Sequence, residues 1–336
     1  MVAGGIESDL FYGKISFRRD TIHDSHPEQW YEDGREGRRS SFSIVIPTYD
    51  RPREIKGCLE SIRRLDYPPE RFEVLVVDDG SPIRLDEVVE PLRIGIDLKL
   101  IRQDNRGPAA ARNTGVAHAQ GKFVAFTDDD CRVDASWLTA LEAQIRGRPD
   151  CIVGGQVVNA LWHNMYAVTS QVILDAVYTF YNSSSNTARF FASNNFAVLT
   201  ETFRGLGGFD TTFPRAAAED RDLCDRWRHA GYPLVCAPDA LVYHAHDMNL
   251  RGYCRQHFNY GRGAWQYHLR RAARGSGRLH DDVRFHAQCP KIFRSLLKEY
   301  SARQRAEIVA LLGIWQICNA AGFFFEKIAT HRSSRP

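Results

Sequence analysis

The feature that most constrains the fold is an alternation of short apolar runs with segments of helical spacing between residues 42 and 145. The apolar runs are only about five to nine residues long and rich in β-branched side chains, which predicts buried strands. Strands that alternate with helices predict an α/β fold, with a mostly parallel sheet flanked by helices. The expected strands are SFSIVIP (41–47), FEVLVVDDGS (72–81), LKLIRQ (98–103) and KFVAFTDDD (122–130), and the expected helices are 54–65 and 109–119.

The pattern changes after Pro149, where strands and helices no longer alternate regularly. We therefore divide the chain into an N-terminal extension (1–40), a core domain (41–250) with halves 41–150 and 151–250, and a helical C-terminal region (251–336). Within the second half we expect strands over 151–158 and 189–199, helices over 164–180 and 219–231, and a strand, a turn and a second strand over 232–246.

Composition excludes several classes of protein. The net charge of +3 is too small to predict nucleic acid as a partner. None of the eight cysteines forms a CxxC pair, so a zinc ribbon is not expected. The first residues, MVAGGIESDLFYGK, lack the pattern of a signal peptide, and a cytoplasmic protein is the simplest expectation.

One C-terminal segment, residues 308–325, contains no charged side chain. Its 18 residues reach only the lower limit for a membrane-spanning helix, and Gln316 and Asn319 are poorly suited to the middle of a bilayer. The segment therefore predicts either a buried core helix or a helix on a membrane surface. The second alternative implies peripheral contact through 308–325 with the cytoplasmic face of the membrane.

Aspartates follow the predicted strands where each strand ends. Asp78-Asp79 and the triplet Asp128 to Asp130 should meet at one edge of the sheet, beside Pro47-Thr48, because parallel strands place their carboxyl ends together. Five carboxylates in one place raise one another's pKa unless a cation is present, and hard divalent cations prefer oxygen ligands. In an extended strand, Asp128 and Asp130 share one face and Asp129 the other. A solvated turn at the triplet and Asx caps at Asp78-Asp79 remain alternatives.

Six segments occur in an order that resembles one known family. They are IVIPTYDRP (44–52), VVDDGS (76–81), NRGPAAARNTG (105–115), FTDDDC (126–131), LGGFD (206–210) and EDRDLCDRWRHAG (219–231). This ordered set resembles the family 2 glycosyltransferases, which have the GT-A fold. The resemblance covers about 42–250, and it departs from the usual pattern at Asp129, often a small residue, and at Ser193-Asn194, often a glycine pair.

The resemblance implies a donor site in the first half of the domain, for a nucleotide-diphospho-sugar and most simply a UDP-sugar. Asp130 would ligate Mn²⁺ or Mg²⁺, together with His244 or, as the less favoured choice, His246. The other implied donor contacts are Pro47 and Thr48 with the base, Asp79 with a uracil imide, Arg112 with the diphosphate and Asp128 with the ribose.

The same resemblance implies the residues of the transfer step. Asp220 would act as the base that removes the acceptor's proton. Glu219 or Asn195 would position the acceptor. A single displacement inverts the anomeric carbon, so the expected enzyme is an inverting, hexosyltransferase-like glycosyltransferase.

The acceptor expected from these features is a glycan or a lipid-linked molecule, as in the synthesis of polysaccharides, glycolipids or other cell-surface glycans. Two other readings stay open. D-x-D at a strand end also occurs in metal-dependent phosphatases and phosphotransferases, and a non-catalytic nucleotide-sugar-binding protein would keep the same acidic residues.

Overall fold

The computed structural model describes residues 41–333, apart from 183–187 and 214–216. The predicted N-terminal extension (1–40) therefore lies outside the described residues. The described part contains an eight-stranded sheet in the order β3-β2-β1-β4-β7-β6-β8-β5. Its strands are β1 (Phe42–Thr48), β2 (Phe72–Asp78), β3 (Asp97–Arg102), β4 (Phe123–Phe126), β5 (Cys131–Val133), β6 (Ile152–Asn159), β7 (Phe196–Leu199) and β8 (Leu234–His244).

The first four strands form the parallel part of the sheet, as predicted. β1 lies between β2 and β4, and β3 pairs with β2 in parallel. β7 then runs antiparallel to β4 and to β6, while β6 and β8 are parallel to each other. The sheet is therefore mixed but mostly parallel, and the predicted fold class is confirmed.

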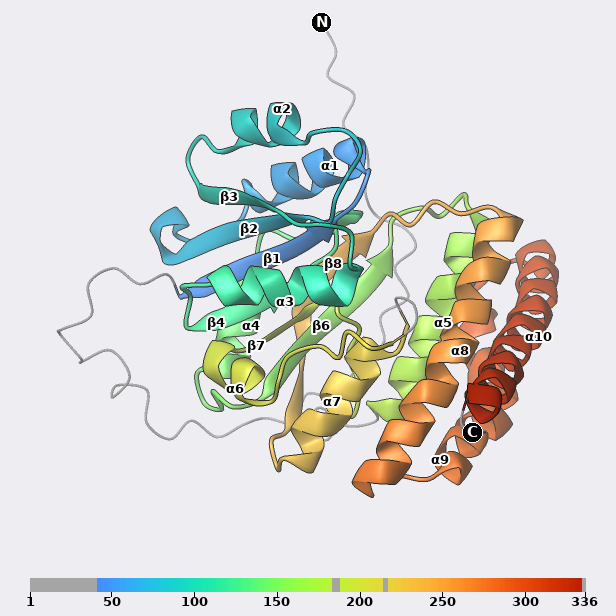
Figure 1. Ribbon diagram of the computed structural model, residues 1–336. Helices are drawn as coiled ribbons and strands as arrows, with labels where there is room; N and C mark the ends of the chain where they lie inside the picture. Colours follow the sequence, from blue (N-terminus) through green and yellow to red (C-terminus); the bar gives the residue numbers. More distant parts are fainter. Residues whose placement is uncertain (1–40, 183–187, 214–216, 334–336) are drawn as a thin grey trace, which may run out of the picture.

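Helices cover both faces of this sheet (Figure 1). Side chains of a strand point alternately to the two faces, so Ile44 and Ile46 enter one apolar core and Val45 enters the other. The first core also contains side chains of α1 (Pro52–Ile62), α2 (Asp86–Val89) and α4 (Trp137–Ile145). The second contains side chains of α3 (Pro108–His118), α5 (Met165–Tyr181), α6 (Thr200–Gly205) and α7 (Glu219–His229).

Three strand predictions need correction. β4 ends at Phe126, and the aspartate triplet lies in the turn that follows, which the Cys131 N–H closes by donating to the Asp128 carbonyl at 3.1 Å. Only Phe196–Leu199 of the predicted strand 189–199 is a strand. Residues 232–246 form the single strand β8 and not a hairpin: Ala237 pairs with Gly155 and Leu241 with Gln156, so the residues between Ala237 and Leu241 bulge out of the ladder. Pro238, which has no N–H to donate, lies in this bulge.

The C-terminal region is helical, as predicted, and forms a bundle with α5 at one side of the sheet (Figure 1). Its helices are α8 (Leu250–Arg274), α9 (Leu279–Leu296) and α10 (Ala302–Ser333). α8 and α10 pack closely because glycines meet backbone at their crossing: a Cβ at Gly261 would lie 1.9 Å from the Asn319 carbonyl oxygen. An ion pair of 2.7 Å between Arg262 and Glu326 joins the same two helices.

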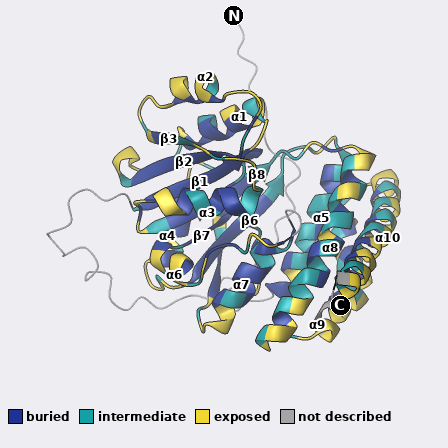
Figure 2. Cartoon of the chain, viewed as in Figure 1, coloured by how far each residue is buried: buried dark blue, intermediate teal, exposed yellow. Residues whose placement is uncertain are grey.

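α10 carries the apolar segment 308–325. By length and composition it is the one helix of the described chain that could cross a membrane. Only 17% of its most apolar stretch is buried, so it is not a core helix, and Figure 2 shows exposed residues along it. Ile317, Phe325 and Ile328 are each more than half exposed. The structure therefore contradicts the predicted buried core helix and shows a helix with an exposed apolar surface.

Candidate active site

The carboxyl ends of β1, β2 and β4 meet at one edge of the sheet, as the sequence predicts. The backbone N–H of Asp79 donates to the Thr48 carbonyl at 2.9 Å, and the Thr48 hydroxyl donates to Asp129 at 2.8 Å. Pro47, Thr48, Asp79 and the aspartate triplet all line one cavity of about 1030 Å³. This volume exceeds the roughly 300–1,000 Å³ of most small-molecule sites.

Asp78 and Asp79 order the loops at this edge. Asp78 is buried, accepts the N–H of Ser81 at 2.9 Å and pairs with Arg102 at 3.0 Å. Asp79 accepts the backbone N–H groups of Arg106 and Gly107, at 2.9 and 2.7 Å, in the loop that leads into α3. The capping alternative thus applies to Asp78, while Asp79 ties a more distant loop to the cavity that it lines.

The three aspartates of the triplet do not alternate as an extended strand would. Asp128 pairs with Arg112 at 2.6 Å. Asp129 and Asp130 both reach the same guanidinium nitrogen of Arg51, at 2.8 and 2.9 Å. The predicted sharing of one face by Asp128 and Asp130 is wrong, because the strand has already ended and the chain is turning.

Arg51 is a site residue that sequence reasoning missed, although it lies in the quoted segment IVIPTYDRP. It follows Asp50, which has a positive φ of 55°, so the backbone turns sharply after β1 and brings Arg51 over the triplet. Burial, followed by repulsion from Asp130, raises the pKa of Asp129 to about 6 despite the charge of Arg51. The cluster is therefore short of positive charge even with one arginine present.

A second cluster at this edge can hold a cation. Ligand atoms of Asp130, His244 and His246 all lie within 4.8 Å of one another. Pairing of β5 with β8 puts Cys131 opposite His244, so Asp130 lies beside that histidine, 3.2 Å from its Nε2. The structure brings both histidines to Asp130, where the sequence favoured His244.

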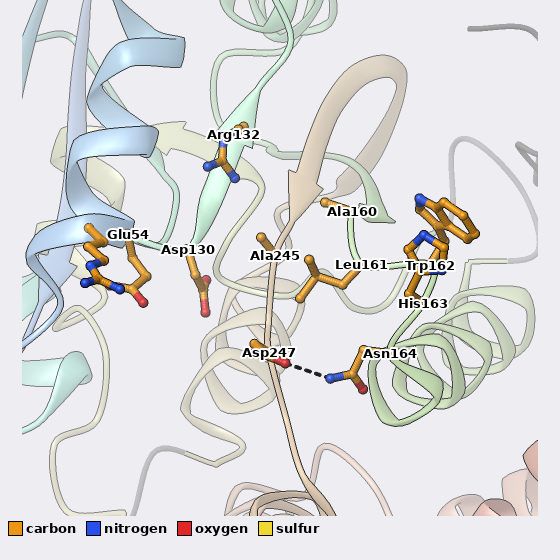
Figure 3. Close-up of a pocket in the computed structure, with 11 residues that line it drawn as sticks. Glu54, Asp130, Arg132, Ala160, Leu161, Trp162, His163, Asn164, Ala245 and Asp247 are labelled. Carbon is orange, nitrogen blue, oxygen red and sulfur yellow. Dashed lines mark hydrogen bonds between the residues drawn. The ribbon is translucent and has the colours of Figure 1, made fainter. Parts of the chain in front are cut away.

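The chain after β8 is extended, which explains why both histidines face the cavity. His244, His246 and Met248 line it, whereas the alternate residues Ala245 and Asp247 line a separate pocket of about 610 Å³ that also touches Asp130 (Figure 3). Asn164 donates to Asp247 at 2.7 Å and anchors this segment to the start of α5.

The donor set of this cluster fits a divalent transition metal. Imidazole suits transition-metal ions and carboxylate suits hard ones, so one carboxylate with two imidazoles fits a divalent transition metal better than Mg²⁺. Burial opposes charge on Asp130, but the hydrogen bond and charge of His244 and the charge of Arg51 hold the pKa of Asp130 well below its usual range. Burial, then the charge of His244, lowers the pKa of His246. Burial opposes charge on His244, but the hydrogen bond and charge of Asp130 raise the pKa of His244, so a metal ion bound here would displace the proton from that ring.

Glu219 and Asp220 begin α7 and line the same cavity. Glu219 lies 3.5 Å from Arg112, which also holds Asp128, so one buried arginine connects the acidic pair to the triplet. Burial, and then the charge of Asp220, raises the pKa of Glu219 to about 7. Burial also raises the pKa of Asp220. The preceding Ala218 has φ +72°, a left-handed conformation that alanine adopts only at a cost.

Asn195 does not reach the cavity, contrary to its predicted role. It is fully buried, accepts from the Trp137 indole at 2.8 Å, and donates to the Gln156 and Ala240 carbonyls at 2.7 and 2.9 Å. The side chain therefore ties β6, β8 and α4 together. The preceding Ser193 and Asn194 line the cavity instead, and the side-chain amide oxygen (Oδ1) of Asn194 is buried without a partner among the described residues.

These features define a class: a mixed, mostly parallel sheet flanked by helices, with an Asp–His cluster that could hold a cation and a buried acidic pair around one cavity, is the GT-A architecture. Residues 43–205 match the family model described as Glycosyl transferase family 2. The chain belongs to glycosyl transferase family 2 through this domain.

Solved structures share the fold. A mannosyltransferase of Pyrobaculum calidifontis, in complex with GDP-Man and Mn²⁺, superposes with a TM-score of 0.62 at 19% identity over 88% of each chain. The TarS 1–349 structure of S. aureus with UDP-GlcNAc has a TM-score of 0.52 at 17% identity, over 83% of this chain and 81% of that one. At such identities the likeness concerns the fold alone.

Curated relatives match parts of the chain. Glycosyltransferase AglE of Haloferax volcanii is 36% identical over 117 residues, 34% of this chain and 38% of AglE. The pre-mycofactocin glycosyltransferase of Mycobacterium tuberculosis is 29% identical over 229 residues, 66% of this chain and 46% of that protein. The matches thus span less than half the length of these relatives.

Proposed function

We propose that the protein is a metal-dependent, inverting glycosyltransferase that moves a sugar from a nucleotide-diphosphate donor, in the first instance a UDP-sugar, to an acceptor hydroxyl. The observation that carries this proposal is the convergence of three groups in one cavity: the aspartate triplet, the Asp130–His244–His246 cluster and the Glu219–Asp220 pair. A structural role alone does not account for so many carboxylates in one cavity.

In the proposed reaction, these groups act on the donor and the acceptor together. The acceptor hydroxyl oxygen attacks the anomeric carbon of the donor and forms the new C–O bond, while the bond from that carbon to the diphosphate oxygen breaks. Asp220 takes the hydroxyl proton, and the nucleoside diphosphate leaves with the bonding electrons. Attack from the side opposite the leaving group inverts the anomeric centre.

Cationic side chains meet the charge that develops on the leaving diphosphate. Arg112 and Arg51 both line the cavity, and they lie against the aspartates that face the donor end. Asp130, His244 and His246 would hold the divalent ion, which supplies further neutralisation of phosphate charge when bound. Asp79, Thr48 and Pro47 remain the proposed contacts of the base, and Asp128 that of the ribose.

A binding screen tests the donor and the metal together. Thermal unfolding of the full chain is measured with UDP-sugars and GDP-sugars, with and without Mn²⁺ or Mg²⁺, and we expect a stabilising shift that needs both ligands. Asp130→Ala should abolish the shift, and it should remain in Asp134→Ala, which removes a carboxylate of the same region that does not line the cavity.

The reaction products distinguish a transferase from a phosphatase and from a binding protein without activity. A transferase releases nucleoside diphosphate from the donor, whereas release of inorganic phosphate would identify a phosphatase. Donor binding without turnover of any kind would identify a binding protein. No metal-assisted donor binding by folded protein would refute the proposal.

We further propose that the protein works in the cytoplasm on the inner face of the membrane, with a lipid-linked or cell-surface glycan acceptor. The exposed apolar side chains Ile317, Phe325 and Ile328 of α10 support a helix that lies on the bilayer. Close packing of α10 on α8, with the Arg262–Glu326 pair between them, favours surface contact over a span. Vesicle flotation tests this placement, as described in the Discussion.

A further inference from the structure

The cavity that holds the candidate active site does not end there. It continues from the strand ends into the helical bundle and is lined by side chains of α5, α8, α9 and α10. Figure 1 shows these helices gathered at one side of the sheet. A donor bound at the strand ends would leave the part of this cavity within the bundle free for a second ligand, for which the proposed acceptor is the candidate.

α10 turns one stripe of side chains towards this cavity. Gln316, Asn319, Phe323 and Lys327 line it at spacings of three and four residues, as one face of a helix does. Gln316 and Asn319 are the two amide residues of segment 308–325, which contains no charged side chain. Both line the cavity, where Gln316 is also open to solvent and Asn319 is half-buried, while the exposed apolar side chain of Ile317 does not line it.

The far end of the cavity is bordered by apolar side chains that solvent can reach. Val283 of α9 is 59% exposed and Phe324 of α10 is 57% exposed, and both line the cavity, as does the partly exposed Leu279. Phe324 is the neighbour of Phe325 on the exposed apolar face of α10. The opening of the cavity is thus continuous with the surface that we propose to contact the membrane.

Nearer the active site, the same cavity is lined by polar atoms that lack partners. His257 of α8 is 2% exposed, and among the described residues neither of its ring nitrogens has a hydrogen-bond partner. The side-chain oxygens of Gln256 and Ser170 are likewise buried and unpartnered within the described chain, and both residues line the cavity. Buried polar groups in this state need a polar partner within the cavity, either water or a polar group of a ligand.

We propose that this part of the cavity binds the acceptor as an amphiphile. Its hydrocarbon chain enters between α9 and α10 at Val283 and Phe324, and its polar head contacts His257, Gln256 and Ser170 on the way to Asp220. The inference rests on the proposed function, because it assigns an acceptor to the same site. It goes further by identifying the acceptor's lipid chain as a group that the protein itself binds.

Calorimetric titration of the full chain with n-hexyl and n-octyl β-D-glucoside, below their micellar concentrations, tests the channel. Each methylene that enters an apolar site strengthens binding about fourfold, so the octyl compound should bind about 15 times more tightly than the hexyl compound. Ala320 and Ala321 form a matched pair of exposed alanines on α10, of which only Ala320 lines the cavity. Ala320→Trp should weaken octyl binding at least tenfold, and Ala321→Trp should change it less than twofold.

A second pair of variants tests the outer opening of the cavity with side chains that are no larger than the native ones. Phe324→Gln should reduce the gain from hexyl to octyl, whereas Phe325→Gln, next to it but outside the cavity lining, should not. Equal effects in the two members of either pair, or affinity that does not depend on chain length, would overturn the channel. Metal-assisted donor binding is measured on the same proteins. If the wild type binds no donor but the glucoside results are as expected, the proposed function is refuted and the acceptor channel is not.

Discussion

Replacing Asp220 by asparagine removes the proposed base while it keeps the size of the side chain and one oxygen that can accept a hydrogen bond. General base catalysis contributes about 10²–10⁴ in rate, which corresponds to about 3–5 kcal/mol of activation free energy. We therefore expect kcat for donor turnover to fall by at least a hundredfold. Glu219→Gln is the comparison, because Glu219 adjoins Asp220 but is not assigned the proton transfer, and its loss should be at least ten times smaller.

The raised pKa values of Glu219 and Asp220 predict how kcat depends on pH. Burial and the charge of Asp220 raise the pKa of Glu219 to about 7, and burial raises the pKa of Asp220. A base must be deprotonated to act, so kcat should rise about tenfold per pH unit below an apparent pKa near 7 and level off above it. Two neighbouring carboxyls titrate together, so this value belongs to the pair. Asp220→Asn removes the repulsion at Glu219 and should abolish the step near pH 7.

The assay is release of nucleoside diphosphate from the nucleotide-sugar that gives the largest Mn²⁺-dependent thermal shift, with water or an octyl glucoside as acceptor. Donor binding by calorimetry and thermal unfolding serve as controls, and both should be retained in Asp220→Asn because a buried like charge has been removed. Near-normal turnover in Asp220→Asn, or a hundredfold loss in Glu219→Gln alone, would refute the assignment of the base.

Two further predictions concern α10. Gly322→Ala should destabilise the fold by about 1–3 kcal/mol in urea unfolding, since the new Cβ would lie 1.9 Å from the Phe258 carbonyl oxygen, while Gly313→Ala, with no atom within 4 Å, should be neutral or slightly stabilising. Equal stability of the two variants would contradict the close α8–α10 contact. Joint replacement of Ile317, Phe325 and Ile328 by serine should reduce flotation with anionic phospholipid vesicles at least tenfold, whereas serine at the exposed Ile83 and Ile94 should leave it unchanged; flotation that persists in the α10 variant would exclude this face as the membrane contact.

Much of the donor half of the site follows from local sequence. Short β-branched runs form buried strands wherever helices cover them, and aspartates at the ends of parallel strands meet without any further information. The gathering of Thr48, Asp79 and Asp129 was predictable for this reason. The resemblance in motif order also predicted that Glu219 and Asp220 of α7 belong to the site, although they lie more than 85 residues after Asp130 in the chain.

Other features were decided by tertiary structure. The turn after Phe126 sends Asp129 and Asp130 to one arginine, and the register of β5 against β8 selects the neighbours of Asp130. Asn195 is a polar residue in a promising motif, but packing encloses it with Trp137. None of these outcomes is visible in periodicity, because each depends on segments far apart in the chain.

Burial pattern and chain direction are local properties, so the order of residues along the chain was enough to predict the class of fold, the strand ends and the acidic character of their edge. Tertiary structure sets which cation each carboxylate meets, brings both histidines to Asp130, and places the amide side chains of the uncharged segment 308–325 along the end of the same cavity. Those contacts depend on the register between distant strands and on how closely α8 and α10 approach. Contacts between segments that are far apart in the chain cannot be predicted from any one segment.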